Sequence, residues 1–356
     1  MTNLQMFPVL NERGQMVGSK SFPMVRDFDS AVRMGGGGAV LVMDAAIAGG
    51  LAFLNGELEK RDPKVREPLA AIWWPRDITA KTGGGWVDWT STLNVSYATA
   101  GGNQNGIIGG ESNAIPVMQA DIGKDVYPVF TWCNLLSISY VDQAKLQNIG
   151  RSLDDILDKG IRLNYQKTVD QNVYTGFSSA GQTGLVNNPN VAAASAPVGA
   201  SGYTQWSKKT PQEILNDVNT ALTDAWTASG YDVTGMPDTV LIPPAQYQYL
   251  VTTVVSTAGN QSILKFLLEN NVALEMGVEL HIGPRPFLKA AGTGGTDRMM
   301  VYRNDEDRVY FDMPVPLSRI LTQPDVKEMA YLSAYAAQIG VVKFLYLEPV
   351  QYMDGI

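Results

Sequence analysis

The stretch that most constrains the fold is residues 152–174, which predict one long helix with a single apolar face. Ser152 is a good N-cap residue, and two aspartates soon after it place negative charge where the helix dipole favours it. Asp158 and Arg162 form an acid-before-base pair, four residues apart, on the polar face. Apolar side chains recur at helical spacing along the other face: Leu153, Ile156, Leu157, Ile161, Tyr165, Thr168, Val169 and Val173.

Residues 72–133 have the composition of long strands joined by loops. They are rich in Trp, Tyr, Thr, Val and Ile and are interrupted by clusters of Gly and Asn. The middle of the stretch is too rich in glycine to form a compact core alone. Exposed tryptophans on such a ribbon are a liability in a monomer, so we expect Trp86 and Trp89 to cover either this chain's own body or a neighbouring copy.

Helices and strands alternate over residues 205–295, which indicates an α/β block. It opens with the capping box TPQE (210–213), whose proline takes the first helical position. A buried strand and a second helix follow in residues 238–251, then a short helix in 263–271 and a strand that ends in Gly-Pro.

The two ends of the chain are predicted less sharply. Residues 1–38 predict an extended arm, and residues 39–60 a helix. Near the C-terminus, two apolar runs around an acidic turn in residues 297–314 predict a hairpin. Residues 328–353 have nearly continuous strand composition, broken at Gly340.

The chain has one histidine and one cysteine, which excludes most familiar catalytic and metal sites. A Ser-His-Asp or Cys-His arrangement would have to use His281, which lies at the end of a strand-like run. Sites with two histidines or several cysteines are ruled out. Cys133, beside Trp132 and Leu135, is predicted to be a small buried residue. We therefore expect no catalytic residues, no cofactor and no metal.

Charge and hydropathy restrict the partners. The formal net charge of -8 argues against a broad basic face that binds nucleic-acid phosphates tightly. The most apolar stretch, residues 39–54, is too short for a membrane span and contains Asp44. Residues 1–15 lack a secretory signal pattern. These features predict a protein that is made in the cytoplasm and does not enter a membrane.

The order of these parts resembles the major capsid proteins of tailed bacteriophages, which share the Hong Kong 97-type fold, in the family distantly similar to encapsulin and linocin-like shell proteins. The resemblance covers most of the chain after residue 45. It is carried by LEKRDPKVREPL (58–69), IGRSLDDILDKGIRLNYQKTVDQNVYTG (149–176), GLVNNPNV (184–191), DTVLIPPAQYQYL (238–250) and MMVYRNDEDRVYFDMP (299–314).

The resemblance implies an α+β fold with an N-terminal arm, an extended β-ribbon (the E-loop), a long spine helix, an α/β axial domain and a peripheral β-layer. Mapped onto this sequence, residues 1–71 are the arm and its helix, 72–133 the E-loop, 134–204 the peripheral domain with the spine helix at about 152–174, 205–295 the axial domain, and 296–356 the return into the peripheral domain.

The stretch TGFSSAGQTGLVNNPNV (175–191) would then be the turn that sends the chain back along the subunit after the spine helix. Its glycines and asparagines allow left-handed or tight conformations, and Asn-Pro fixes a bend. We expect Leu185 and Val186 to anchor the turn in the core. The alternative is an ordinary surface loop.

The function implied by the resemblance is self-assembly into hexamers and pentamers of an icosahedral phage head around packaged double-stranded DNA, in the cytoplasm of a bacterial host. Trp86, Trp89 and Tyr97 are the expected contacts to a neighbouring copy. Further expected partners are portal, scaffolding or decoration proteins, with weak non-specific contact to DNA and none to a membrane. Two alternatives stay open: an encapsulin-like nanocompartment shell, and a soluble α/β enzyme of unknown reaction.

Overall fold

The computed structural model describes residues 4–10, 16–23, 68, 70–100, 116–148, 153–232, 234–256 and 260–356. The chain divides into two compact units, Met1–Leu69 and Ala70–Ile356. In the first unit, β1 (Leu4–Leu10) and β2 (Met16–Pro23) pair antiparallel where only an extended arm was expected. The predicted helix at 39–60 and nearly all of the motif at 58–69 lie outside the described residues.

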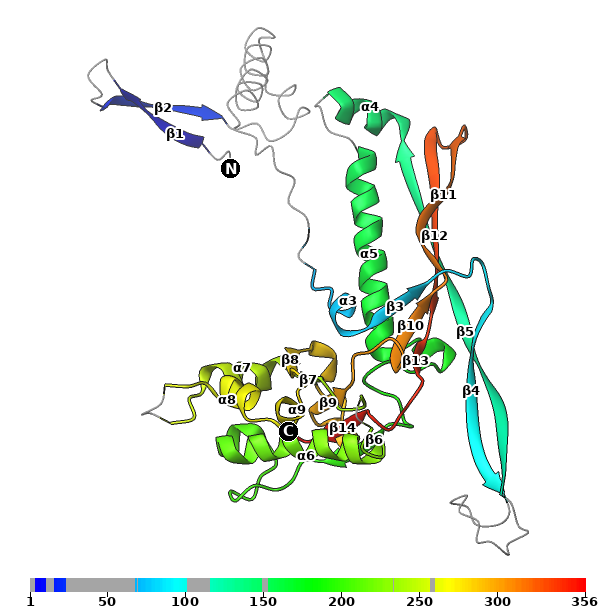
Figure 1. The fold of residues 1–356 in the computed structure, drawn as a ribbon. Coiled ribbons are helices and arrows are strands. Elements are labelled where there is room, and N and C mark those ends of the chain that lie inside the picture. Colours follow the sequence, from blue (N-terminus) through cyan, green and yellow to red (C-terminus); the bar gives the residue numbers. More distant parts are fainter. Residues whose placement is uncertain are drawn as a thin grey trace, which may run out of the picture. The chain divides into compact units, whose positions relative to one another are not determined.

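The predicted long helix is present as α5 (Leu153–Thr175). Its apolar face packs against a sheet (Figure 1). The predicted N-cap, Ser152, lies outside the described residues. Ile156 is exposed, so the buried face narrows toward the start of the helix. On the polar face, the Arg162 Nε donates to Asp158 Oδ2 at 2.8 Å. The buried members of the predicted stripe are Ile161, Tyr165, Val169 and Val173.

A four-stranded sheet supports this helix and also carries a projection. Its order is β11 (Val315–Asp325), β12 (Ala330–Gly340), β5 (Val117–Ser139) and β4 (Trp89–Ala100). Strand β5 changes partner along its length, because residues 129–139 pair with β12 and residues 117–128 pair with β4. The β4–β5 pair therefore leaves the body as a two-stranded ribbon, and α4 (Tyr140–Asn148) follows the other end of β5 (Figure 1).

Cys133 is exposed, so the prediction that it is buried is wrong. Successive residues of a strand point to opposite faces of the sheet. On β5, Leu136 and Ile138 pack with Ile161 of α5, whereas Leu135 faces the other way and is exposed. The apolar residues next to Cys133 in the sequence therefore did not indicate that Cys133 is buried. Cys133 lies on the same face of the strand as Leu135, and no other described element covers that face.

The α/β block is built on a second sheet, of five strands, in the order β6-β14-β9-β7-β8. The strands are β6 (Ala192–Ser195), β7 (Thr239–Ile242), β8 (His281–Pro284), β9 (Arg298–Tyr302) and β14 (Gln351–Asp354). The helices beside them are α6 (Pro211–Ala228), α7 (Pro244–Thr252), α8 (Ile263–Glu269) and α9 (Val272–Glu275). Short 3-10 turns occupy Ser178–Ala180, Trp206–Lys208, Pro286–Leu288 and Thr293–Gly295.

Helix α6 begins with the predicted capping box. The Thr210 hydroxyl accepts from the Glu213 backbone N–H at 3.3 Å, and the Glu213 carboxylate accepts from the Thr210 backbone N–H at 2.7 Å. Ile214, Val218 and Leu222 are fully buried in the core of the block. The strand and helices predicted between residues 238 and 271 are also confirmed. In the part of the chain that the structure describes, no helix is long and apolar enough to cross a membrane.

The predicted hairpin at 297–314 is wrong, although both of its strands exist. Strand β9 pairs with β7 and β14, whereas β10 (Val309–Met313) pairs with β13 (Val342–Phe344) and β3 (Thr79–Thr82) in a separate sheet. The acidic turn between them is therefore a crossing from one sheet to the other. Two apolar runs around a polar turn predict strands, but tertiary packing chooses their partners. The predicted break at Gly340 is confirmed, because β12 ends there.

The turn at 175–191 is anchored in the core, as predicted, and is not an ordinary surface loop. Leu185 and Val186 are almost completely buried. The Tyr352 hydroxyl donates to the Leu185 carbonyl at 2.6 Å, and the Arg298 Nη1 donates to the Val186 carbonyl at 2.8 Å. The apolar residues of this glycine-rich stretch therefore hold it in place.

Gly184→Ala is expected to lower the free energy of unfolding by about 3 kcal/mol, because a Cβ there would lie 2.5 Å from the backbone carbonyl carbon of Tyr174. The matched control is Gly181→Ala in the same turn, where φ is +66° but a Cβ meets open space. Only the left-handed backbone conformation opposes that change, so Gly181→Ala is expected to lower the free energy of unfolding by about 1 kcal/mol. Urea unfolding followed by tryptophan fluorescence measures both. Equal losses would contradict a close approach at Gly184.

Candidate functional site: a ribbon with one apolar face and a buried root

The β4–β5 ribbon has one apolar face and one polar face. The strand register places Val95 opposite Ile122, and Tyr97 opposite Ala120. Cross-strand partners share a face, and successive residues alternate between faces. The large exposed apolar side chains of the ribbon, with the exception of Val117, therefore gather on one side: Trp89, Leu93, Val95, Tyr97, Met118, Ile122 and Val126. The opposite face carries Thr90, Asn94, Ser96, Asp121 and Asp125.

The apolar face is open to solvent along the ribbon. Tyr97 is 72% exposed, and Leu93 and Met118 are each 70% exposed. Among the described residues of this face, Lys124 is the only one that carries a charge. A two-stranded ribbon with free edges and an uncovered apolar face marks an interaction site or an aggregation liability. The face therefore needs another protein surface to cover it.

The three contact residues expected from the sequence lie on or next to this ribbon. Trp89 and Tyr97 share the apolar face, whereas Trp86 is exposed in the loop that precedes β4. Sequence reasoning missed Leu93 and Val95, although the alternation from Leu93 to Tyr97 is itself a signal of a strand with one apolar face. The partners on β5 became identifiable only once the register was known.

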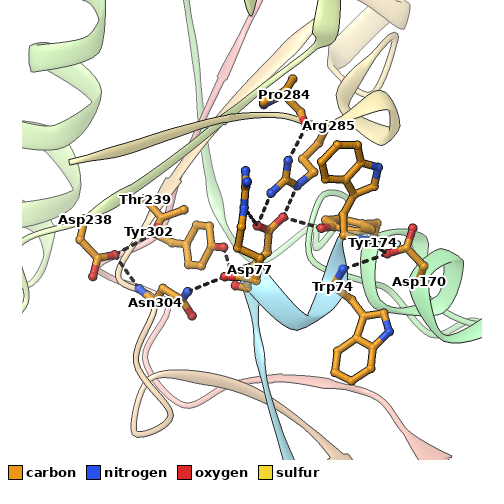
Figure 2. A network of polar contacts seen from close by, with 12 residues as sticks. Trp74, Asp77, Asp170, Tyr174, Asp238, Thr239, Pro284, Arg285, Tyr302 and Asn304 are labelled. Atoms are coloured by element: carbon orange, nitrogen blue, oxygen red, sulfur yellow. Dashed lines mark hydrogen bonds and ion pairs between the residues drawn. The ribbon is translucent and has the colours of Figure 1, made fainter. Parts of the chain in front are cut away.

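The root of the ribbon is held by a buried ion pair, which Figure 2 shows. Asp77, the last residue of α3 (Trp74–Asp77), and Arg285, which follows β8, have no exposed surface. The guanidinium donates through Nε and Nη2 to both carboxylate oxygens, and the Tyr174 hydroxyl of α5 donates to the same carboxylate. The Tyr302 hydroxyl of β9 donates to the Asp77 backbone carbonyl at 2.6 Å. We call these four residues the hub.

Further contacts fix the segment that enters the hub. The Asp170 Oδ1 accepts from the backbone N–H groups of Trp73 at 2.8 Å and Trp74 at 2.9 Å. The guanidinium carbon of Arg285 lies 4.6 Å from the centre of the Trp73 ring, a cation–π contact. The chain that leads into β3 and the ribbon is therefore tied to α5 and to the five-stranded sheet.

The pKa shifts of Tyr174, Tyr302 and Arg285 keep these three groups of the hub in one protonation state. Burial raises the pKa of Tyr174 far above its ordinary value, and the charge of Asp77 adds to the rise. The same two causes raise the pKa of Tyr302. Burial by itself lowers the pKa of Arg285, but its hydrogen bonds and charge pairing with Asp77 raise it overall. Groups whose pKa lies far from neutral pH are suited to holding structure rather than to transferring protons.

His281 has the setting of a structural residue. It is the first residue of β8, and its backbone N–H donates to the Asp238 carbonyl at 2.7 Å. Burial lowers its pKa, and the positive charge of Arg76 lowers it further. Among the described residues, no group of three or more His, Cys, Asp or Glu side chains is arranged to hold a metal ion.

These features define a class of protein. A long helix on a sheet fixes the body, a buried hub fixes the root of the ribbon, and the ribbon's apolar face is left for another surface to cover. This is the construction of a subunit that assembles with other chains.

Comparison with known proteins identifies the family. The family model for the major capsid protein matches residues 103–356, which is most of the chain. The chain therefore belongs to the major capsid protein family. No curated protein sequence matches it.

Solved capsid structures have the same fold. The capsid of Myoviridae phage XM1 matches with a TM-score of 0.67 at 16% identity, covering 85% of this chain and 98% of that one. The structure of Microbacterium phage Oxtober96 matches with a TM-score of 0.57 at 8% identity, covering 85% and 98%. The capsid of an empty GTA particle matches with a TM-score of 0.55 at 11% identity, covering 85% and 97%.

The expected fold is confirmed: the chain has the mixed helix and sheet fold of tailed-phage capsid proteins, the Hong Kong 97 type. With the family match, it is a phage head shell protein whose partners are copies of itself. The nanocompartment and soluble-enzyme alternatives are not favoured.

Proposed function

We propose that the chain assembles into the hexamers and pentamers of an icosahedral phage head that encloses packaged double-stranded DNA. The observation that carries this proposal is the exposed apolar face of the β4–β5 ribbon. Seven large side chains on one face of a narrow ribbon are costly in a free subunit and favourable once a neighbour covers them. Trp89 and Tyr97 supply large contacts with little side-chain entropy to lose, and Trp86 extends the contact toward the body.

The parts of the subunit have separate roles in this proposal. Residues 72–133 form the E-loop that reaches a neighbour, and residues 134–204 and 296–356 form the peripheral domain around the spine helix. Residues 205–295 form the axial domain, which meets its copies around the fivefold and sixfold axes. Residues 1–71 form the arm and its helix, and the arm before residue 38 reaches a further neighbour. The hub supports this division because it ties the root of the E-loop to the spine helix through Tyr174 and to the axial domain through Arg285.

The remaining expectations follow from charge and from the family. The net charge of -8 favours weak, non-specific contact with the packaged DNA. We propose portal, scaffolding or decoration proteins as further partners, assembly in the cytoplasm of the bacterial host, and no reaction catalysed by the chain. We propose the phage head as the location of the assembled chain.

The test is the size distribution of the purified full-length chain, measured by mass photometry with negative-stain microscopy, alone and with the scaffolding and portal proteins of the same phage. We expect closed particles or ring-shaped capsomers. A chain that stays monomeric or dimeric under all these conditions would overturn the proposal.

A further inference from the structure

Complementary surfaces lie at the two ends of helix α6. The first is the loop before the helix, residues 197–209, which we call the leading loop. It is tightly built, because the Gly199 N–H donates to the Tyr203 carbonyl at 2.9 Å and the Gly202 N–H donates to the Gly199 carbonyl at 2.9 Å. The Glu213 Oε1 of α6 accepts from the Ala200 backbone N–H at 2.6 Å and so ties the loop to the helix.

The leading loop presents apolar side chains and one cation. Val198 is 67% exposed and Tyr203 is 51% exposed. The Lys208 Nζ lies 3.7 Å from the centre of the Tyr203 ring, and no carboxylate pairs with it among the described residues. The next residue, Lys209, is buried and its Nζ lies 2.5 Å from Asp217. Only Lys208 is therefore available to an outside partner.

The second surface is a cleft of about 1310 Å³ at the other end of α6, which we call the acidic cleft. It lies between Leu93 and Val95 of the ribbon on one side and the body on the other. The body contributes the C-terminal end of α6, the crossing at residues 305–308 and the segment at 345–349. Its apolar wall includes Leu93, Val95 and Tyr346, and its carboxylates are Asp232, Asp305, Asp307 and Glu348.

The charges of the cleft are not balanced. Arg308 is the only cation among the residues that line it, and its Nη2 donates to Asp232 at 2.5 Å and to the Thr234 hydroxyl at 2.8 Å. Neither Asp307 nor Glu348 forms an ion pair with a described residue. The Asp305 carboxylate accepts from the Asp307 backbone N–H at 3.0 Å and from no other group among the described residues. Three carboxylates beside an apolar wall favour a ligand with a cation next to apolar side chains.

We propose that the leading loop of one copy docks into the acidic cleft of a second copy, with Lys208 among Asp305, Asp307 and Glu348 and with Tyr203 against the apolar wall. The inference rests on the proposed function, since it assumes that copies assemble. Eighteen helical residues separate the two surfaces, a distance of roughly 27 Å at 1.5 Å per residue. A loop tied to the start of α6 cannot reach its own cleft. The contact is therefore head-to-tail, which generates a ring when the rotation closes.

The experiment is a charge reversal with reciprocal rescue. Lys208→Glu and Glu348→Lys are each expected to reduce self-association at least tenfold at low salt, because each places like charges together. Combining the two is expected to restore most of the association. The loss in the single variants should shrink at high salt, because ions screen the repulsion. Mass photometry counts every species, from dimers to shells, and circular dichroism checks that each variant is folded.

Lys289→Glu is the matched control, since it makes the same charge change at an exposed lysine outside both surfaces. Single reversals that assemble like the wild type would overturn the docking proposal, even where the wild type forms shells. A loss caused by Lys208→Glu that Glu348→Lys does not repair would show that Lys208 meets another surface, which also overturns it. A wild-type chain that never associates would overturn both this inference and the proposed function.

Discussion

Tyr97→Asp is expected to leave the subunit folded and to lower the yield of closed particles at least tenfold. Tyr97 is 72% exposed in the subunit, so the folded chain tolerates a carboxylate there. Covering that carboxylate with a neighbour's surface leaves a charge without a partner, and a penalty of about 1.4 kcal/mol already lowers an association constant tenfold. Each subunit of a shell incurs this free-energy penalty, so the total cost grows with the number of subunits. Mass photometry of the assembly reaction measures the yield.

The control for this variant is the next residue along the strand. Ala98 lies exposed on the polar face of the same ribbon, opposite the uncharged Gln119, so Ala98→Asp adds the same charge at nearly the same place but on the opposite side. We expect it to assemble like the wild type. Ile122→Asp on β5 should behave like Tyr97→Asp, because the two residues share the apolar face. If Ala98→Asp lost assembly as strongly as Tyr97→Asp, charge alone would explain the effect and the apolar face would not.

The parts of the fold that the sequence predicted are those set by local periodicity. The stripe that includes Ile161 and Val169 repeats at the helical period, and the capping box at Thr210 needs only its own four residues. The strands β9 and β10 were recognisable for the same reason. Their partners were not, because pairing is decided by elements far away in the sequence, and so a hairpin was predicted where the chain crosses between two sheets.

The candidate site, too, was predictable from the sequence only in part. The aromatic residues Trp89 and Tyr97 were identified from composition, but which residues share a face depends on the β4–β5 register. Lys208 and Lys209 are adjacent and chemically identical, yet one is exposed and the other is buried with Asp217. The partners in the hub are 208 residues apart, and nothing in the local sequence of Asp77 identifies Arg285. Such pairings are fixed by tertiary packing and not by pattern.

Arg285→Met is expected to lower the free energy of unfolding by about 3–5 kcal/mol, the usual cost of removing one partner from a buried ion pair. Both side chains of the pair have no exposed surface. The substitution keeps most of the side-chain volume but leaves the Asp77 carboxylate buried, with the Tyr174 hydroxyl as its remaining side-chain hydrogen-bond donor and the Arg76 Nε, 3.9 Å away, as its remaining cation. Urea unfolding followed by tryptophan fluorescence measures the loss, because Trp73 lies beside the hub.

An exposed pair supplies the control. Arg162 and Asp158 form an ion pair at 2.8 Å on the polar face of α5, with more than half of the Arg162 side chain exposed. Arg162→Met should therefore cost only about 0.5 kcal/mol. Asp77→Leu combined with Arg285→Met should recover part of the loss, because it removes the buried carboxylate that has lost its closest cation. If Arg285→Met cost no more than Arg162→Met, the hub would not depend on a buried charge pair. The root of the ribbon would then be held by the packing of α3 and α5 alone.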